Sequence, residues 1–326
     1  MNKKIFIIGV LVIIIIGIFI FFRIKLNEEK ETKIISYYNN PIIPKGFHTV
    51  DTETAKWTKK ENGSIKDWNK GLVIEDENGN QFVWIPVKKE DLSYEIKEIE
   101  EEFKYKLEEF NTSNAEEEQI IKYGGFYISR YEAGVPLEMQ SRLTAISSKT
   151  NDISGMPVSK KGIIPWNYIS FKNAKQNAES MYNNNYYSSH LPTLKQMMYI
   201  TSWLNKSAYN VYNSSDFGNY SNVNFKFSGY YSDDYGKNYK FADNKIKGEK
   251  NMILSTGATD RNMTNNIYDL AGNLWEYTND YCAINENEIL GYYCVGGHYD
   301  NTGDNYPIYS HNLKNVEPLD KVGFRI

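Results

Sequence analysis

The segment 266–278 holds the residues with the clearest chemical potential, in the order Asn-Ile-Tyr-Asp-Leu-Ala-Gly-Asn-Leu-Trp-Glu-Tyr-Thr. Asp269 and Glu276 stand on either side of a Gly-Asn pair, which is typical of a tight turn. Such a turn can bring two carboxylates and the carbonyls between them onto one hard cation, such as calcium. The ligand spacing of an EF-hand is missing. The spacing alone therefore leaves two interpretations, a calcium site and a turn without metal, and Trp275 is expected to be buried beneath it.

Two cysteines, Cys282 and Cys294, are too few for a four-cysteine zinc site or an iron–sulfur cluster. We predict a disulfide between them, which would contribute about 3 kcal/mol to stability if it is unstrained. Because disulfides persist in oxidising compartments, this bond would favour a position outside the cytoplasmic membrane. The alternative is two free, buried thiols.

A second candidate site follows the cysteines, where His298 and His311 flank a stretch dominated by Asn, Asp, Tyr, Ser and Thr. Tyrosine combined with short polar side chains is typical of contact surfaces, because it gives a large contact area at low entropic cost. The whole chain is rich in Asn and Tyr, so an ordinary loop is an equal alternative. The predicted ligand surface consists of His298, Tyr299, Asp300, Asn301, Asp304, Tyr306 and His311.

The hydrophobic run 5–22 contains no charged residue and is about 27 Å long as a helix, enough to cross a bilayer. No small-residue cleavage site follows it. We predict an uncleaved transmembrane anchor in residues 1–25, a stalk and domain lead-in over 26–71, and a single-pass protein of the cell membrane. Lys3 and Lys4 favour a cytoplasmic N-terminus, but the basic residues after the run outnumber them, so charge alone does not decide the orientation.

The composition bounds the remaining possibilities. The chain has 326 residues with a net charge of -4, which gives no electrostatic reason to expect a nucleic-acid partner. An Asn-Gly turn between apolar runs predicts a β-hairpin over 72–85. Apolar residues at 99, 103, 107 and 110 predict an amphipathic helix in a charged insertion at 88–122, and further helices are expected at 169–182 and 193–204. The rest reads as short strands and long loops, so the fold class is α+β.

Seven stretches, in the same order, resemble the family of formylglycine-generating enzymes and sulfatase-modifying factors. Besides segment 266–278, these are Phe82-Val83-Trp84-Ile85-Pro86, Phe126-Tyr127-Ile128-Ser129-Arg130-Tyr131-Glu132, Pro165-Trp166 with Ile169-Ser170-Phe171-Lys172-Asn173-Ala174, Leu191-Pro192-Thr193, Gly296-Gly297 and Gly323-Phe324-Arg325-Ile326. The resemblance covers residues 72–326. It implies a C-type-lectin-like fold with little regular secondary structure. It also implies a calcium ion held by the side chains of Asp269 and Glu276 and the carbonyls of Gly272 and Leu274.

The departures from the family concern its catalytic metals. In the copper-dependent oxidases, the Gly-Gly pair is followed by two cysteines five residues apart that hold the metal. Here the segment 296–301 reads Gly-Gly-His-Tyr-Asp-Asn, and Tyr306 stands at the second position. Without two soft thiolates the copper site is missing. The iron site of the ergothioneine-type relatives needs two histidines four residues apart, and the four histidines, His48, His190, His298 and His311, contain no such pair.

Two functions follow from these departures. The first is a surface-tethered module that binds an extracellular ligand or protein and performs no chemistry. The second is a metal-dependent oxidase with an atypical site, for which His298, Asp300 and Asp304 offer ligands.

Overall fold

A computed structural model describes residues 41–52, 56–57, 65, 67–88, 114–139, 152–285, 288–314 and 318–326. The predicted anchor at 5–22 and the apolar positions 99–110 of the charged insertion lie outside these ranges. Among the residues described, none of the helices has the length and apolar character needed to cross a membrane.

The first sheet contains the predicted hairpin. Its four antiparallel strands follow the chain order β1 (Phe47–Thr49), β2 (Val73–Asp76), β3 (Gln81–Pro86) and β4 (Gly125–Ser129). The β2–β3 turn forms because the Asp76 carboxylate accepts the backbone N–H groups of Asn78 and Asn80, at 2.9 and 2.7 Å. The hairpin is confirmed, and β1 adds residues of the predicted lead-in to its edge.

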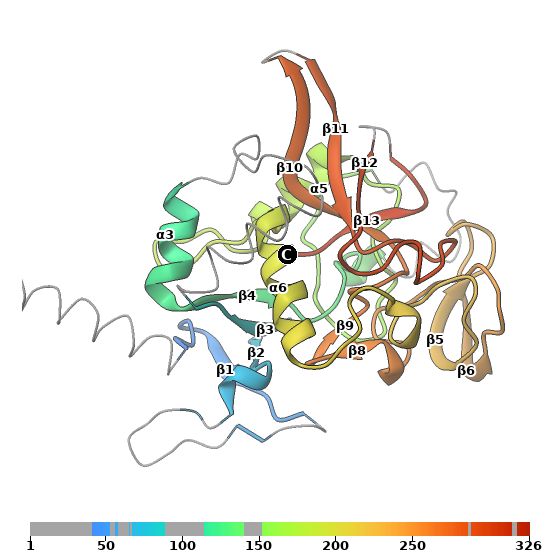
Figure 1. Cartoon of the computed structure of the whole chain (residues 1–326), viewed down its shortest axis with the longest axis horizontal. Helices are drawn as coiled ribbons and strands as arrows, with labels where there is room; N and C mark the ends of the chain where they lie inside the picture. The colour runs from blue at the N-terminus through green and yellow to red at the C-terminus, as the bar shows by residue number, and fades with distance from the viewer. Residues whose placement is uncertain are drawn as a thin grey trace, which may run out of the picture.

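The second sheet carries the segment 266–278 into the core. Its order is β12 (His311–Lys314), β11 (Glu288–Val295), β10 (Trp275–Asn285) and β13 (Val322–Phe324). β13 runs parallel to β10, with Glu276 opposite Gly323, so the C-terminus lies beside the predicted metal site. Figure 1 shows β10 and β11 projecting from the body of the domain as a long hairpin.

Three helices cover these sheets: α3 (Asn114–Tyr123), α5 (Phe171–Met181) and α6 (Leu194–Lys206). Ser170 caps α5, and Thr193 with Gln196 forms a capping box on α6. Both helices match the predicted ranges within two residues. α5 contacts β10, and α6 contacts β3, β10 and β11.

The remaining strands are short. β5 (Lys226–Ser232) pairs with β6 (Lys240–Ile246) and β7 (Ile253–Leu254), and β8 (Met263–Thr264) pairs with β9 (Ile267–Tyr268). In the described part of the chain, 3-10 helices lie at Trp68–Lys70, Ser214–Asp216 and Asp260–Asn262.

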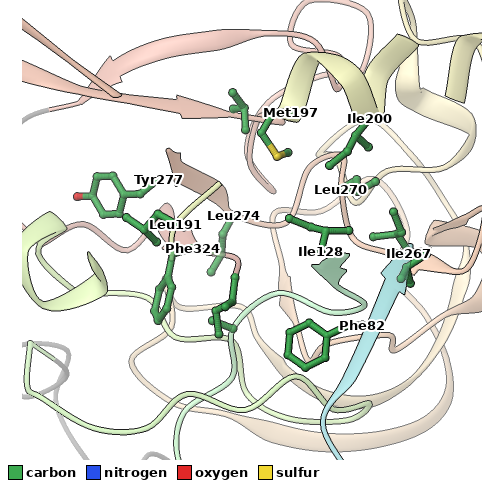
Figure 2. Close-up of a cluster of buried hydrophobic side chains, with 14 of the residues drawn as sticks. Phe82, Ile128, Leu191, Met197, Ile200, Ile267, Leu270, Leu274, Tyr277 and Phe324 are labelled. Carbon is green, nitrogen blue, oxygen red and sulfur yellow. The ribbon is translucent and has the colours of Figure 1, made fainter. Parts of the chain in front are cut away.

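One hydrophobic cluster joins both four-stranded sheets to α5 and α6. Figure 2 shows Met197 and Ile200 of α6 beside Leu270 and Ile128, with Phe324 of β13 near Leu274. The α+β prediction is confirmed, and the segment 266–278 lies at the centre of this core.

Candidate functional site

The Gly-Asn turn between Asp269 and Glu276 is formed as predicted. Gly272 and Asn273 both have positive φ angles, 72° and 59°. A Cβ atom at Gly272 would lie 2.3 Å from the carbonyl oxygen of Asn219, so no other residue fits there. Trp275, at the start of β10, is 1% exposed, which confirms that it is buried.

Asn273 joins the turn to three other segments of the chain. Its Nδ2 donates to Glu132 Oε2 and to the carbonyl of Leu254. Its Oδ1 accepts from Asn219 Nδ2 and from the backbone N–H of Leu254, both at 2.9 Å. The asparagine is fully buried, so these bonds replace water for every polar atom of its side chain.

Glu132 is a carboxylate that binds two residues of the turn, Asn273 and Leu274. It follows β4, is 1% exposed and also accepts the backbone N–H of Leu274 at 3.2 Å. Burial raises its pKa well above the ordinary value, and the negative charges of Asp269 and Glu276 add to the rise. The positive charge of Arg325 and the hydrogen bond from Asn273 act against this rise of the pKa.

Arg325 forms a buried ion pair with Glu276. Its Nε lies 2.9 and 3.1 Å from the two carboxylate oxygens, and its Nη2 lies 2.7 Å from Oε1. The arginine also donates to the backbone carbonyls of Ser129, Tyr268 and Asp269. One terminal side chain thus holds β4, β9 and β10 together. Burial raises the pKa of Glu276, and the adjacent guanidinium counteracts this.

These contacts test whether calcium fits the predicted ligands. The Asp269 carboxylate accepts from the N–H of Gly257 at 2.7 Å and from Asn262 Nδ2 at 3.3 Å, and burial raises its pKa to about 6. All four carboxylate oxygens of Asp269 and Glu276 therefore already have protein donors. The prediction that these two side chains share a calcium ion does not fit this arrangement, in which Arg325 supplies the positive charge. The other two predicted calcium ligands, the carbonyls of Gly272 and Leu274, belong to the same turn. Within the described ranges, no group of three or more His, Cys, Asp or Glu side chains could hold a metal ion.

A second internal cation satisfies carbonyl groups near the turn. Lys247 is fully buried, and its Nζ donates to the carbonyls of Tyr220 and Val223 at 2.6 and 3.4 Å. Burial and the nearby Arg261 lower its pKa to about 8. The Lys247 ammonium thus binds two loop carbonyls at once, which is a role that a bound cation could also have.

The predicted disulfide is wrong. Cys294 is a free, buried thiol in β11, and burial raises its pKa. In the strand register, Cys282 lies opposite Gly291, three residues from Cys294, whereas Cys294 lies opposite Tyr277. Three residues of strand span about 10 Å, beyond the Cα separation that a disulfide allows. The spacing in the sequence did not reveal that the two cysteines are offset along the hairpin, because the strand register is irregular between Tyr277 and Tyr281.

The predicted ligand surface is partly interior. His298 is 6% exposed and Tyr299 is 1% exposed. Because neither side chain is accessible to a ligand, the prediction that they belong to a ligand surface is wrong. The Tyr299 hydroxyl donates to Asp320 at 2.6 Å, and His298 Nδ1 accepts the N–H of Asp300 at 3.1 Å. Burial lowers the pKa of His298 to about 3, and the charge of Lys321 adds to the shift.

The other members lie nearer the surface. Asp300 binds Lys321 at 2.8 Å and Asn251, and the Asn301 side chain accepts the N–H of His298. Asp304 and Tyr306 are exposed, and His311 is half-buried beside the ring of Tyr293. The ring of Tyr306 meets Trp275 edge-on, with centroids 5.9 Å apart. The exposed part of the surface thus lies beside the tryptophan of the turn.

Four residues at the centre of the site were not predicted as site residues: Glu132, Asn219, Lys247 and Arg325. Glu132 and Arg325 stand in stretches that resemble the family, and a charged residue among mostly apolar neighbours could have suggested a buried charge that needs a partner. Nothing in the local sequence distinguishes Asn219 or Lys247.

Comparison with known proteins identifies the family of this chain from its sequence. A search of curated proteins found no match. Among solved structures, the crystal structure of CarF is 18% identical, with a TM-score of 0.40, and the match covers 62% of this chain and 85% of that one. The sequence model described as the sulfatase-modifying factor enzyme 1-like domain matches residues 96–326, well over half of the chain. The chain therefore belongs to the sulfatase-modifying factor family.

Proposed function

We propose that this chain is a membrane-anchored binding module, displayed outside the cytoplasmic membrane, that keeps the family's domain without its oxidase chemistry. The observation that carries this proposal is how the segment after Gly296-Gly297 uses its polar groups. His298 Nδ1 accepts the backbone N–H of Asp300. The Asp300 carboxylate accepts hydrogen bonds from Lys321 Nζ and Asn251 Nδ2. These groups hold the segment together and are not directed onto a common metal position.

The alternative, an oxidase with an atypical metal site, needs ligands that these residues do not offer. Asp304 is exposed, whereas His298 is buried, so the three candidate ligands differ in their surroundings. The two cysteines lie before the glycine pair, and Cys294 is a buried thiol whose raised pKa disfavours the thiolate that a metal needs. The surface beside Trp275 is instead suited to contact, with an exposed tyrosine and short polar groups.

Metal content and oxidase activity test this proposal. The purified full chain in mild detergent, incubated with copper(I) or iron(II) and then desalted, is expected to retain neither metal at stoichiometric levels. It is also expected not to consume oxygen when a cysteine-containing peptide is added. Elemental analysis and an oxygen electrode give the two readouts. Stoichiometric copper or iron with peptide oxidation would establish the oxidase instead.

The membrane anchor is the second part of the proposal, and the charge-free run of residues 5–22 supports it. The free thiol of Cys294 removes the disulfide as an argument for the outer side, so topology needs its own test. Protease added to intact cells is expected to degrade the C-terminal domain, because residues after 25 lie outside. A cytoplasmic marker protein provides the control. A domain that is degraded only after the cells are lysed would place it inside.

A further inference from the structure

We infer that Lys314 and Trp275 form an anion-binding subsite, which takes a carboxylate or phosphate group of the ligand. This inference rests on the proposed binding function and names the chemical class of ligand. It adds two residues that are not in the predicted ligand surface, Trp275 on β10 and Lys314 on β12 of the second sheet.

The strand register brings the two residues onto one face. Trp275 and Tyr277 are two residues apart on β10, so their side chains share a face. Tyr277 lies opposite Cys294, and Lys314 lies opposite Tyr292, two residues before Cys294 on β11. All these side chains therefore share one face, and the Lys314 ammonium lies 5.1 Å from the centroid of the Trp275 ring.

Both residues carry donors that the described part of the chain leaves without an acceptor. The Trp275 indole is 1% exposed, and its Nε1 has no hydrogen-bond partner. Lys314 is half-buried, and its ammonium lies over the Trp275 ring but forms no ion pair with a carboxylate among the described residues. A buried N–H and a partly desolvated ammonium without acceptors are costly, and a bound anion would satisfy both.

The nearby carboxylates are engaged elsewhere. Asp300 binds Lys321, and Asp320 accepts the hydroxyl of Tyr299. Burial lowers the pKa of Lys314, and the positive charge of Lys321 contributes. Within the described ranges, the face around Trp275 therefore carries a positive charge that is not paired with a carboxylate, although the whole chain is acidic. Local charge of this sign favours an anionic group of the ligand.

The surroundings of Trp275 also suit a ligand with a flat or apolar part next to its anionic group. Tyr306 is 39% exposed and lies edge-on to the indole, and the centroid of the His298 ring lies 6.3 Å from that of the indole. A few placed polar groups among aromatic rings are typical of small-molecule sites. The exposed tyrosine would contact the ligand body, and Lys314 would bind its charge.

Inorganic phosphate and acetate are the minimal probes for the two sources of negative charge. Melting of the full chain is measured with increasing sodium phosphate or sodium acetate, at ionic strength held constant with sodium chloride. Wild-type protein is expected to show a saturable rise in melting temperature, because the anion binds the native state alone. Saturation with phosphate only assigns a phosphate group, and saturation with acetate as well assigns a carboxylate.

Three variants test the assignment. Lys314→Met is expected to weaken the apparent anion affinity about tenfold or more, and Trp275→Phe, which keeps the ring but removes the N–H, about fivefold. The variants are compared by the rise in melting temperature that the anion causes. The absolute melting temperature is not used, because removing a half-buried charge changes stability by itself. Lys226→Met, at an exposed position on β5, is the matched control and should leave the affinity unchanged.

Absence of saturable stabilisation, or an unchanged response in Lys314→Met, would overturn the subsite. The proposed binding function would survive that result if copper and iron still fail to bind. Conversely, stoichiometric copper or iron would overturn the proposed function whatever the anions do, so the two failures are distinguishable.

Discussion

Arg325→Met is expected to lower the free energy of unfolding by about 3–5 kcal/mol, because it leaves a buried carboxylate without its counter-ion. Arg325 is fully buried, and Glu276 is 1% exposed. The substitution also removes the donor to the carbonyls of Ser129 and Tyr268. Urea denaturation of the full chain in mild detergent, followed by tryptophan fluorescence, measures the loss.

Two comparisons interpret this loss. Lys161→Met breaks an ion pair with Asp260 whose side chains are both more than half exposed, and it should cost below about 1 kcal/mol. The double variant Arg325→Met with Glu276→Leu should recover part of the loss, because it removes the unpaired charge. A chelator should not change wild-type stability, since the internal arginine and not calcium binds Glu276. If Arg325→Met costs no more than Lys161→Met, or if the chelator destabilises the wild type, the ion pair is not what holds the site.

Asn273→Ala is expected to cost about 3 kcal/mol or more. The change leaves Glu132 Oε2 and the N–H of Leu254 without the partner that Asn273 supplies, at about 1–3 kcal/mol for each unsatisfied group. It also removes one of the two acceptors of Asn219 Nδ2, which keeps the carbonyl of Met252. It also places alanine at a φ of 59°, which is unfavourable for a residue other than glycine or asparagine. The same urea denaturation experiment measures the effect.

The contribution of the backbone can be separated from that of the hydrogen bonds. Asn244 has a similar φ of 49° on the exposed strand β6, so Asn244→Ala reports the backbone cost alone. Asn273→Gly removes the backbone cost but keeps the loss of hydrogen bonds, and it should remain strongly destabilising. Asn273→Asp keeps the shape but puts a carboxylate against Glu132, so we expect it to be at least as harmful as alanine near neutral pH. Equal effects at positions 273 and 244 would show that the hydrogen bonds contribute nothing.

The sequence by itself determined the features that depend on neighbouring residues. The α5 and α6 helices were predictable because Ser170 and Thr193 cap apolar positions at helical spacing. The hairpin at 72–85 was predictable because its turn needs Asn and Gly. The turn over Trp275 was predictable for the same reason, as was the lack of two cysteines after Gly296-Gly297.

Only the tertiary structure decided what the polar groups of the turn bind. Glu276 meets Arg325 from 49 residues away, and Asn273 meets Glu132 from 141 residues away. These contacts exist because β13 pairs in parallel with β10 and because β4 lies beside the same core, and neither pairing leaves a local sequence signal. Two carboxylates seven residues apart fit either a cation or an internal arginine. The choice between these depended on the register of a strand that forms from the last residues of the chain.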